Sequence, residues 1–535
     1  MTDNLTSRLA SEVKRRRTFA IISHPDAGKT TLTEKLLLYG GAIHLAGSVK
    51  ARRAARHATS DWMKLEQERG ISVTSSVMGF TYEGYQLNLL DTPGHADFSE
   101  DTYRTLIAAD SVVMLLDNRR GVEERTRQLY EVCHRRRTPI FTFINKCDRP
   151  GGTDPLALLD GVERDLGLHC YPITWPISDG NRFLGVYDRL AGLVHIFERG
   201  DDHGQKKAAV TVGALDDPEI QALLGEAARA RLDEEIELLE LAGSEFDHDA
   251  FLAGKVSPTF FGSALMNFGV EPFLRKFLEL APPPMARPTT TGAVDPLDER
   301  FSGFVFKIQA NMDPKHRDRI AFLRVCSGRY EAGMTVKHLR TGRPFRLAPP
   351  TQFLARERTQ IEEAWPGDVV GIHDRGTLRV GDSLAAHDEL EFGDIPRFSP
   401  EHFARIIITD PLRRKQLDEG LRQLSEEGAA QVFYTDSVAG PAPIVGAVGI
   451  LQFDVLLHRL EHEYGVRARL EPMAYRCARW VVGERRLIDA VASTGYGRTL
   501  VHDSKGQPLI LFDNEWTMKT TIEREKGLEF HEVAP

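Results

Sequence analysis

The segment that decides the fold is SHPDAGKTT, which runs from Ser23 to Thr31 and directly follows the apolar run FAII at 19–22. It nearly matches the phosphate-binding loop G-x-x-x-x-G-K-[ST], with Ser23 in place of the first glycine. In such a loop, backbone N–H groups at the start of a helix surround the phosphates, a lysine adds positive charge, and a hydroxyl ligates magnesium. Gly28, Lys29 and Thr30 fill the last three positions. The segment therefore predicts a strand, a phosphate-binding turn and a helix.

A second motif, DTPGH at 91–95, ends the apolar run LNLL and precedes a predicted helix. In GTPases the aspartate of this motif, here Asp91, holds magnesium through a water molecule, and the glycine amide, here Gly94, reaches the γ-phosphate. The tetrapeptide D-x-x-G alone is common in turns. At this distance from SHPDAGKTT it predicts the γ-phosphate side of a nucleotide site.

Two further motifs would read the base. NKCD at 145–148 closes the apolar run PIFTFI, and the carboxylate of Asp148 can accept the N1 and N2 hydrogens of guanine, which adenine lacks. GSA at 262–264 follows PTFF, and its backbone amides are candidates to meet the guanine O6. Four motifs in this order predict a site for GTP and GDP rather than ATP. The predicted nucleotide-binding residues are Ser23, His24, Pro25, Asp26, Ala27, Gly28, Lys29, Thr30, Thr31, Asp91, Thr92, Pro93, Gly94, His95, Asn145, Lys146, Asp148, Ser263 and Ala264.

The pattern around these motifs predicts three units. Short apolar runs alternate with helical stretches from Thr18 to about Leu280, which is typical of an α/β domain with a mostly parallel sheet, and we assign it residues 1–285. The linker-like stretch APPPMARPTTTGAVDP leads into period-two runs that predict a small antiparallel β-barrel over 286–390. The last unit, 391–535, is expected to be α+β, with Leu412, Leu417, Leu421 and Leu424 on one helical stripe.

Composition narrows the class of protein. A chain of 535 residues suits two to four domains, and its net charge of −9, from 68 basic and 77 acidic residues, argues against a general polyanion binder, so we do not expect DNA as a partner. No apolar run approaches the roughly 20 residues that span a bilayer, and no signal peptide is evident, so we expect a cytoplasmic protein without a membrane partner. The five scattered cysteines are expected to be reduced thiols.

Arginines nevertheless cluster in KRRR at 14–17, KARRAAR at 50–56 and HRRR at 134–137. Such runs are usually solvated faces. The functional alternative is contact with phosphates, because that attraction acts locally even when the net charge is negative.

The form S-H-x-D-A-G-K-T, together with RGIS at 69–72 and the histidine that ends DTPGH, resembles the translational GTPases, which the ribosome activates. The resemblance implies that His95 positions the attacking water and that Ser72 takes the place of the usual switch-one threonine. Magnesium would then be held by Thr30, Ser72 and Asp91. Pro25 stands where the family more often has an isoleucine or valine.

Longer segments carry the resemblance further. SDWMKLEQERGISVTSSV at 60–77, FVFKIQANMDPKHRDRIAF at 304–322 and GILQFDVLLHRL at 449–460 are similar to the bacterial peptide chain release factor 3 family. This resemblance implies a GTPase, stimulated by the ribosome, that promotes departure of the stop-codon-reading release factors after peptide release. Another shortened ribosomal GTPase, or a GTP-dependent binding module that does not hydrolyse its nucleotide, are the alternatives.

One motif points elsewhere. HRLEH at 458–462 matches the zinc-protease pattern H-x-x-E-H. The flanking Leu451, Val455, Leu456 and Leu460 form an apolar stripe, so the simpler interpretation is a packed helix whose polar residues, including both histidines, face solvent.

Overall fold

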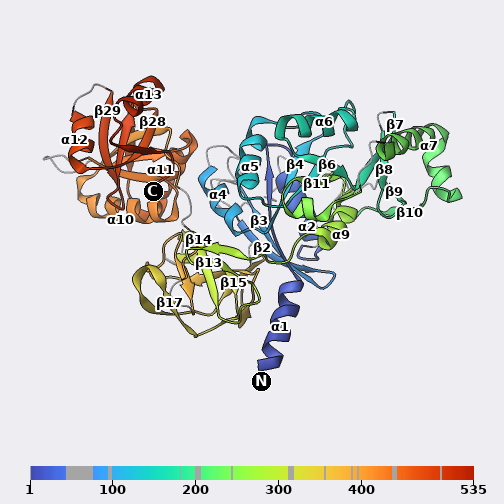
Figure 1. Cartoon of the computed structure of the whole chain (residues 1–535), viewed down its shortest axis with the longest axis horizontal. Coiled ribbons are helices and arrows are strands. Elements are labelled where there is room, and N and C mark those ends of the chain that lie inside the picture. Colours follow the sequence, from blue (N-terminus) through green and yellow to red (C-terminus); the bar gives the residue numbers. More distant parts are fainter. Residues whose placement is uncertain are drawn as a thin grey trace.

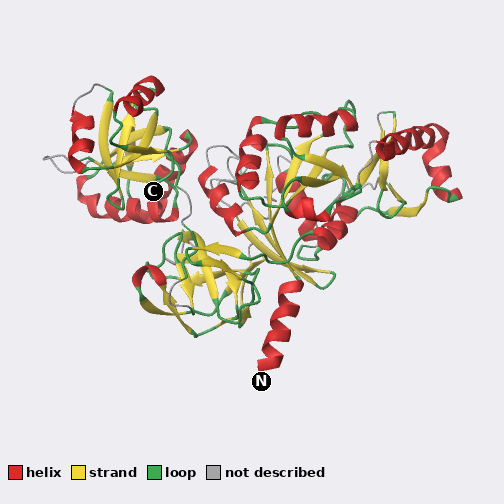
Figure 2. Cartoon of the chain, viewed as in Figure 1, coloured by secondary structure: helices red, strands yellow, loops and turns green. Residues whose placement is uncertain are grey.

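The computed structural model describes residues 2–43, 76–93, 99–180, 182–198, 206–241, 245–310, 319–354, 357–386, 390–393, 397–435, 443–493 and 497–534. Three bodies follow one another along the chain (Figure 1). An α/β unit lies in the centre, a β-rich unit lies below it, and a mixed unit lies at the end away from helix α7 (Figure 2).

The central unit is built on one twisted sheet with the order β2-β3-β1-β4-β5-β11-β6 among the described strands. Each neighbouring pair is parallel except β2 and β3. The strands are β1 (Arg16–Ser23), β2 (Ser76–Tyr82), β3 (Tyr85–Asp91), β4 (Ser111–Asp117), β5 (Ile140–Asn145), β6 (His169–Pro172) and β11 (Val256–Phe261). The helices of this unit are α1 (Thr2–Lys14), α2 (Lys29–Tyr39), α4 (Ser99–Ala108), α5 (Glu124–Arg135), α6 (Pro155–Leu166), α8 (His248–Leu252) and α9 (Val270–Leu280).

The central strands form because their sequences are nearly continuous apolar runs. Every residue of β1, β4 and β5 is buried, as a parallel sheet covered by helices on both faces requires. Apolar side chains from alternate strand positions separate into two clusters, one toward α5 and α6 and one toward α2 and α9. The doubly covered sheet confirms the predicted α/β fold class.

An insertion between β6 and β11 was not anticipated as a separate element. Here the antiparallel sheet β10-β9-β8-β7 packs against the long helix α7, at the far end of the molecule from the C-terminal unit (Figure 1). Its elements are β7 (Thr174–Asp179), β8 (Arg182–Asp188), β9 (Leu193–Phe197), β10 (Val210–Ala214) and α7 (Pro218–Leu241). We call these elements the insertion.

The second unit is antiparallel and barrel-like, as predicted. Its larger sheet has the order β18-β17-β23-β14-β15-β22-β19-β20 among the described strands, beside the pair β16-β21, and the hairpin β12-β13 precedes it. The elements are β12 (Arg287–Thr289), β13 (Gly292–Val294), β14 (Ser302–Ala310), β15 (Arg319–Ser327), β16 (Tyr330–Glu331), β17 (Thr335–His338), the 3-10 turn η2 (Leu339–Thr341), β18 (Arg343–Arg346), β19 (Thr351–Leu354), β20 (Glu357–Gln360), β21 (Glu363–Ala364), β22 (Val369–His373) and β23 (Ser383–Ala385).

The third unit is α+β, again as predicted. One antiparallel sheet, β27-β24-β26-β25-β29-β30-β28-β31, is flanked by helices. The elements are β24 (His402–Ile408), η3 (Pro411–Arg413), α10 (Arg414–Glu427), β25 (Gln431–Tyr434), β26 (Ile444–Ala447), α11 (Ile450–Tyr464), β27 (Ala468–Pro472), β28 (Cys477–Val482), α12 (Arg485–Ser493), β29 (Arg498–Asp503), β30 (Pro508–Phe512), α13 (Glu515–Arg524) and β31 (Glu529–His531). The domain limits at 285 and 390 stay predictions.

The predicted leucine stripe of α10 was wrong at its first member. Leu417, Leu421 and Leu424 are buried, whereas Leu412 lies in η3 before the helix and is 89% exposed. The proline that precedes Leu412 starts a 3-10 turn, so the helical periodicity begins only after it.

The expectation for KRRR was also wrong at two of its arginines. Arg16 and Arg17 are buried in β1, and Arg16 Nε lies 2.9 Å from Asp368 Oδ1 of the barrel-like unit. Arg17 Nη2 donates to Leu278 O at 3.3 Å and its guanidinium covers the ring of Tyr85. Arg16 therefore links two units and Arg17 packs within the α/β unit, so neither lies on a solvated face or at a phosphate site. HRRR is exposed, and KARRAAR lies outside the described residues.

Among the helices that the structure describes, none is both long enough and apolar enough to cross a membrane.

Candidate nucleotide site

The predicted motifs meet at one edge of the central sheet. Because β1, β3, β4, β5 and β11 are parallel, their carboxyl ends lie at the same edge, where open α/β sheets bind ligands. SHPDAGKTT begins at the last residue of β1, Asp91 ends β3, Asn145 ends β5, and GSA follows β11. Segments from opposite ends of the α/β unit's sequence are thus brought into one site.

The phosphate-binding turn has the backbone expected of it. Gly28 is the N-cap of α2 and has a φ of 105°, a backbone conformation that residues other than glycine rarely adopt. A Cβ at this position would also collide with the side-chain amide of Asn145. Gly28 therefore lets the chain turn directly into α2, whose N-terminus lies at this turn and suits it to phosphate.

The charged residues of the turn are poised at the same position. Lys29 is buried, and its Nζ lies 2.5 Å from Asp91 Oδ1, so the lysine and the predicted magnesium-side carboxylate neutralise each other. The Ser23 side chain, in the place of the motif's first glycine, is 2% exposed, so the small hydroxyl fits where a larger residue would not. His24 Nε2 lies 3.4 Å from Glu123 Oε1 at the start of α5.

Asn145 joins the phosphate side of the site to the base side. Its Nδ2 donates to Ala27 O at 2.8 Å, and its Oδ1 accepts a hydrogen bond from the backbone N–H of Ala264 at 2.8 Å. The side chain is 2% exposed, so both bonds form away from water, where their loss costs most. One buried amide thus fixes the spacing between SHPDAGKTT and GSA.

Lys146 makes a second link, and its partner was missed by sequence reasoning. The Lys146 ammonium donates to Asp26 O at 2.5 Å and to Asp117 Oδ2 at 2.6 Å. Burial acts to raise the pKa of Asp117, but the hydrogen bonds from Lys146 and from the Arg119 backbone, together with nearby positive charge, outweigh it and hold that pKa below its ordinary value. The signal was available, because Asp117 ends the apolar strand SVVMLLD just as Asp91 ends LNLL.

Most of the remaining predicted residues lie in the part of the chain that the structure describes, and three do not. Thr30 and Thr31 lie half-buried in the first turn of α2, Thr92 Oγ1 donates to Ile21 O at 2.7 Å, and Ser263 is buried. Pro25, Pro93 and Asp148 also lie at the carboxyl edge, each close in sequence to a residue already placed there. Ser72, Gly94 and His95 lie outside the described residues, so their predicted roles stay predictions.

The chemistry of this donor set fits a magnesium nucleotide. Asp91 and Thr30 offer the carboxylate and hydroxyl oxygens that Mg²⁺ prefers as ligands. Lys29, which pairs with Asp91, can pair with a phosphate instead when a nucleotide is bound. Bound phosphate and cation would give Lys29 and Asp91 each a new partner of opposite charge. This side of the arrangement therefore suits the phosphates of a nucleotide and their cation.

HRLEH does not form a comparable metal centre. His458 and His462 stack at 4.1 Å between ring centroids, and Glu461 pairs with Arg467. The interpretation as a solvated face was wrong for Arg459, which is buried between Glu427 and Glu463. Within the described ranges, no group of three or more histidine, cysteine or acidic side chains is arranged to hold a metal.

Family models match the three units in turn. Residues 14–283 match the elongation factor Tu GTP binding domain, 300–387 match elongation factor G domain 2, and 392–522 match the class II release factor RF3 C-terminal domain. A solved structure from Thermus thermophilus covers 92% of this chain and 72% of its own length, with a TM-score of 0.68 and 24% identity. At that identity the likeness supports the fold alone.

Relatives that align along the whole chain are more similar in sequence than this solved structure. Proteins named peptide chain release factor 3 from Symbiobacterium thermophilum and from a Cyanothece strain are 55% and 53% identical to this chain. The first alignment covers 98% of this chain and 99% of the relative, and the second covers 100% and 98%. A Synechocystis protein of the same name is 53% identical over 97% of this chain and 94% of its own. The chain therefore belongs to the peptide chain release factor 3 family of translational GTPases.

Proposed function

We propose that this protein is a ribosome-stimulated GTPase that promotes dissociation of stop-codon-reading release factors from the ribosome after peptide release. The observation that carries the GTPase half is the pair of hydrogen bonds through which Asn145 fixes the phosphate-binding turn against GSA. The release-factor half rests on family membership along the whole chain.

Each predicted residue then has a role in holding the nucleotide. The backbone of residues 23–31 surrounds the phosphates, and Lys29 leaves Asp91 to neutralise them. Asp148 accepts the N1 and N2 hydrogens of guanine, while the Ala264 N–H, which donates to Asn145 Oδ1 in this structure, exchanges that partner for the guanine O6 when the base is bound. Asp117 pairs with Lys146 and holds its ammonium group against the backbone carbonyl oxygen of Asp26, in the phosphate-binding turn.

Thr30, Ser72 and Asp91 would hold the magnesium ion, with Asp91 acting through a water molecule. The ion supplies charge neutralisation at the phosphates when it is bound. His95 orients the attacking water, and because hydrolysis of this kind depends on positioning, little turnover is expected until a ribosome orders that histidine.

Helix α4 is suited to carry the nucleotide state to the rest of the molecule. It follows DTPGH closely in sequence, and Arg104 in it donates to Glu427 O at the end of α10 in the C-terminal unit. Lys307 of the barrel-like unit lies 3.6 Å from Asp101, also in α4. A change at the γ-phosphate would thus reach both other units through one helix.

The function is tested with terminated ribosomes that carry a fluorescently labelled stop-codon-reading release factor. We expect this protein with GTP to accelerate dissociation of the label. If GTP hydrolysis is stimulated by ribosomes but the label leaves at its spontaneous rate, the protein is another ribosomal GTPase. If neither changes although GTP binds, it is a binding module.

A further inference from the structure

Three phenylalanines form a buried stack between the insertion and the base-reading side of the nucleotide site. Phe183 comes from β8, Phe197 ends β9, and Phe268 lies just after GSA. The rings of Phe197 and Phe268 stack at 5.1 Å with an interplanar angle of 8°, and Phe183 lies 6.3 Å from each of them. All three side chains are at most 5% exposed.

Both base-reading motifs pack on this stack. Cys147 of NKCD and Met266, just after GSA, contact the cluster that Phe183, Phe197 and Phe268 form with Val186. Burial raises the pKa of the Cys147 thiol to about 12, so the thiol stays neutral and acts as an apolar packing group. The Cys147 N–H donates to Gly262 O at 3.1 Å, which ties the two motifs to each other.

The loop after GSA depends on the insertion for its shape. Ser263 and Phe268 exchange two backbone hydrogen bonds of 2.8 and 3.0 Å, which close a tight turn. Inside that turn Asn267 has φ 64°, an uncommon conformation for a residue other than glycine. The Asn267 side chain donates to Lys206 O, at the beginning of the segment that leads into β10. The insertion therefore holds the turn by a ring stack and by a hydrogen bond.

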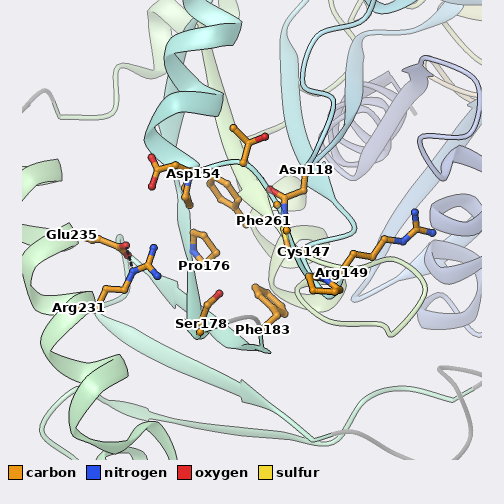
Figure 3. Close-up of a pocket in the computed structure, with 16 residues that line it drawn as sticks. Asn118, Cys147, Arg149, Asp154, Pro176, Ser178, Phe183, Arg231, Glu235 and Phe261 are labelled. Carbon is orange, nitrogen blue, oxygen red and sulfur yellow. Dashed lines mark hydrogen bonds and ion pairs between the residues drawn. The ribbon is translucent and has the colours of Figure 1, made fainter.

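Beside the stack, a pocket of about 290 Å³ separates the rest of the insertion from the NKCD loop. Figure 3 shows Arg231 and Glu235 of α7 on one side of it, and Asn118, Cys147 and Arg149 on the other. Phe183 lines this pocket as well as the stack. The insertion also meets the central sheet elsewhere, because β7 contacts β11 and the ring of Trp175 lies 5.6 Å from that of Phe261. On the pocket side the insertion and the NKCD loop are not packed together, so the phenylalanines form the packed contact between the insertion and Cys147.

We propose that Phe183 and Phe197 are positioning residues for guanine recognition, and that the insertion sets the lifetime of the bound nucleotide through them. Neither side chain belongs to a nucleotide-binding motif, and each acts by holding Phe268 and Cys147 in place. The inference rests on the proposed base-reading roles of Asp148 and Ala264. A partner that displaced the insertion would loosen both motifs at once and speed nucleotide release.

The test is Phe197→Leu in the full-length protein, with dissociation of fluorescent GDP measured by stopped flow. We expect the dissociation rate to rise roughly 10-fold, since a stacked ring is lost beside both base-reading motifs. Discrimination between GDP and inosine diphosphate, which lacks the 2-amino group, should fall at the same time. A general loosening of the fold would weaken both nucleotides equally and leave that ratio unchanged, which would contradict the positioning role.

A matched control is Phe304→Leu in the barrel-like unit, because Phe304 is also buried, at 4% exposed, and lies 5.3 Å from the ring of Phe392. It should leave the GDP dissociation rate and the base discrimination as they are. Phe183→Leu removes the outer ring of the stack. If Phe197→Leu does not fold, Phe183→Leu provides the same test, with a smaller expected rise in the GDP dissociation rate.

The two assignments fail in different ways. If Asp148→Asn changes base preference but neither phenylalanine variant alters GDP dissociation or the inosine ratio, the positioning role is wrong and the base-reading role stands. If Asp148→Asn leaves base preference unchanged, the base-reading role itself is wrong. In the double variant Phe197→Leu with Phe268→Leu, the effects should be less than additive, because the two rings share one contact. Full additivity would contradict the shared stack.

Discussion

At the scale of single residues, the site is a set of side chains that link one motif to another, and the Asn145 link is buried. Asn145 bonds to both the phosphate and base sides, and Lys146 reaches from NKCD to Asp26 and Asp117. These residues preorganise the site, so their substitution is expected to weaken nucleotide binding without removing a direct contact to the phosphates.

Asn145→Ala tests that preorganisation. Two hydrogen bonds of 2.8 Å are lost, so we expect nucleotide affinity to fall roughly 10- to 100-fold, at about 0.5–1.5 kcal/mol for each bond. Equilibrium titration with fluorescent GDP measures it. Asn514→Ala, which removes an asparagine that caps α13, is the control and should bind normally. Wild-type affinity in Asn145→Ala would show that the two loops hold their spacing by other means.

Asp148→Asn tests base reading. The new amide can donate a hydrogen bond where the carboxylate accepted one, which matches the carbonyl of xanthine, so GTP should bind more weakly and xanthosine triphosphate more tightly. Competition between the two nucleotides against a fluorescent analogue decides the matter. A variant that kept its preference for GTP would exclude Asp148 as the base-reading residue.

At the scale of elements, sequence patterns predicted the strands and helices of the central sheet because their signals are local. Apolar runs that end in Ser23, Asp91 and Asn145 mark both a strand and the edge at which it stops. The buried state of Arg16 was not predictable in this way, because its partner Asp368 is distant in sequence and belongs to another unit. The insertion was missed for a related reason, since the short strands of β7–β10 resemble a continuation of the same alternation.

A buried ion-pair cluster fastens α4 to the linker and to the barrel-like unit. Asp110, just after α4, is 1% exposed and pairs with Arg287 at 2.7 Å and with Arg324 at 2.5 Å. Arg287 also donates to the carbonyl oxygens of Ile107 and Ala108, the last two residues of α4. The C-terminus of α4 is therefore capped by a residue from the linker.

Asp110→Ala should destabilise the protein strongly, because Arg324 would stay buried without a carboxylate. We expect a loss of about 3–5 kcal/mol, the range seen when one partner of a buried pair is removed. Urea unfolding followed by tryptophan fluorescence measures it. Asp418→Ala, whose partner Arg414 is exposed, should cost at most about 1 kcal/mol. Equal losses in the two variants would contradict the assigned burial.

At the scale of the whole molecule, α4 is in contact with every unit. Arg104 lies against the C-cap glycine of α10, Gly428, and the ring of Tyr103 lies 4.8 Å from Phe398 in the segment that leads into the C-terminal unit. Helix α4 also follows DTPGH closely in sequence. We therefore expect the nucleotide state to affect the placement of the C-terminal unit through this helix.

Arg104→Ala should loosen the C-terminal unit while GDP affinity stays unchanged, since its described partners Glu100 and Glu427 are not nucleotide-binding residues. We expect faster amide hydrogen exchange at the end of α10 and slower release-factor dissociation on the ribosome. Arg135→Ala, on an exposed turn of α5, is the matched control. Unchanged exchange at α10 in Arg104→Ala would remove this contact from the coupling.

The most direct test of the account is the rate of GTP hydrolysis with and without ribosomes, measured for the wild-type protein and for His95→Ala. We expect slow turnover alone and strong stimulation by ribosomes in the wild type. His95→Ala should bind GTP normally, while its ribosome-stimulated rate falls roughly 10²–10⁴-fold, as for loss of a positioned catalytic group. A wild-type protein that ribosomes do not stimulate, or a His95→Ala variant that hydrolyses GTP at the wild-type rate, would contradict the account.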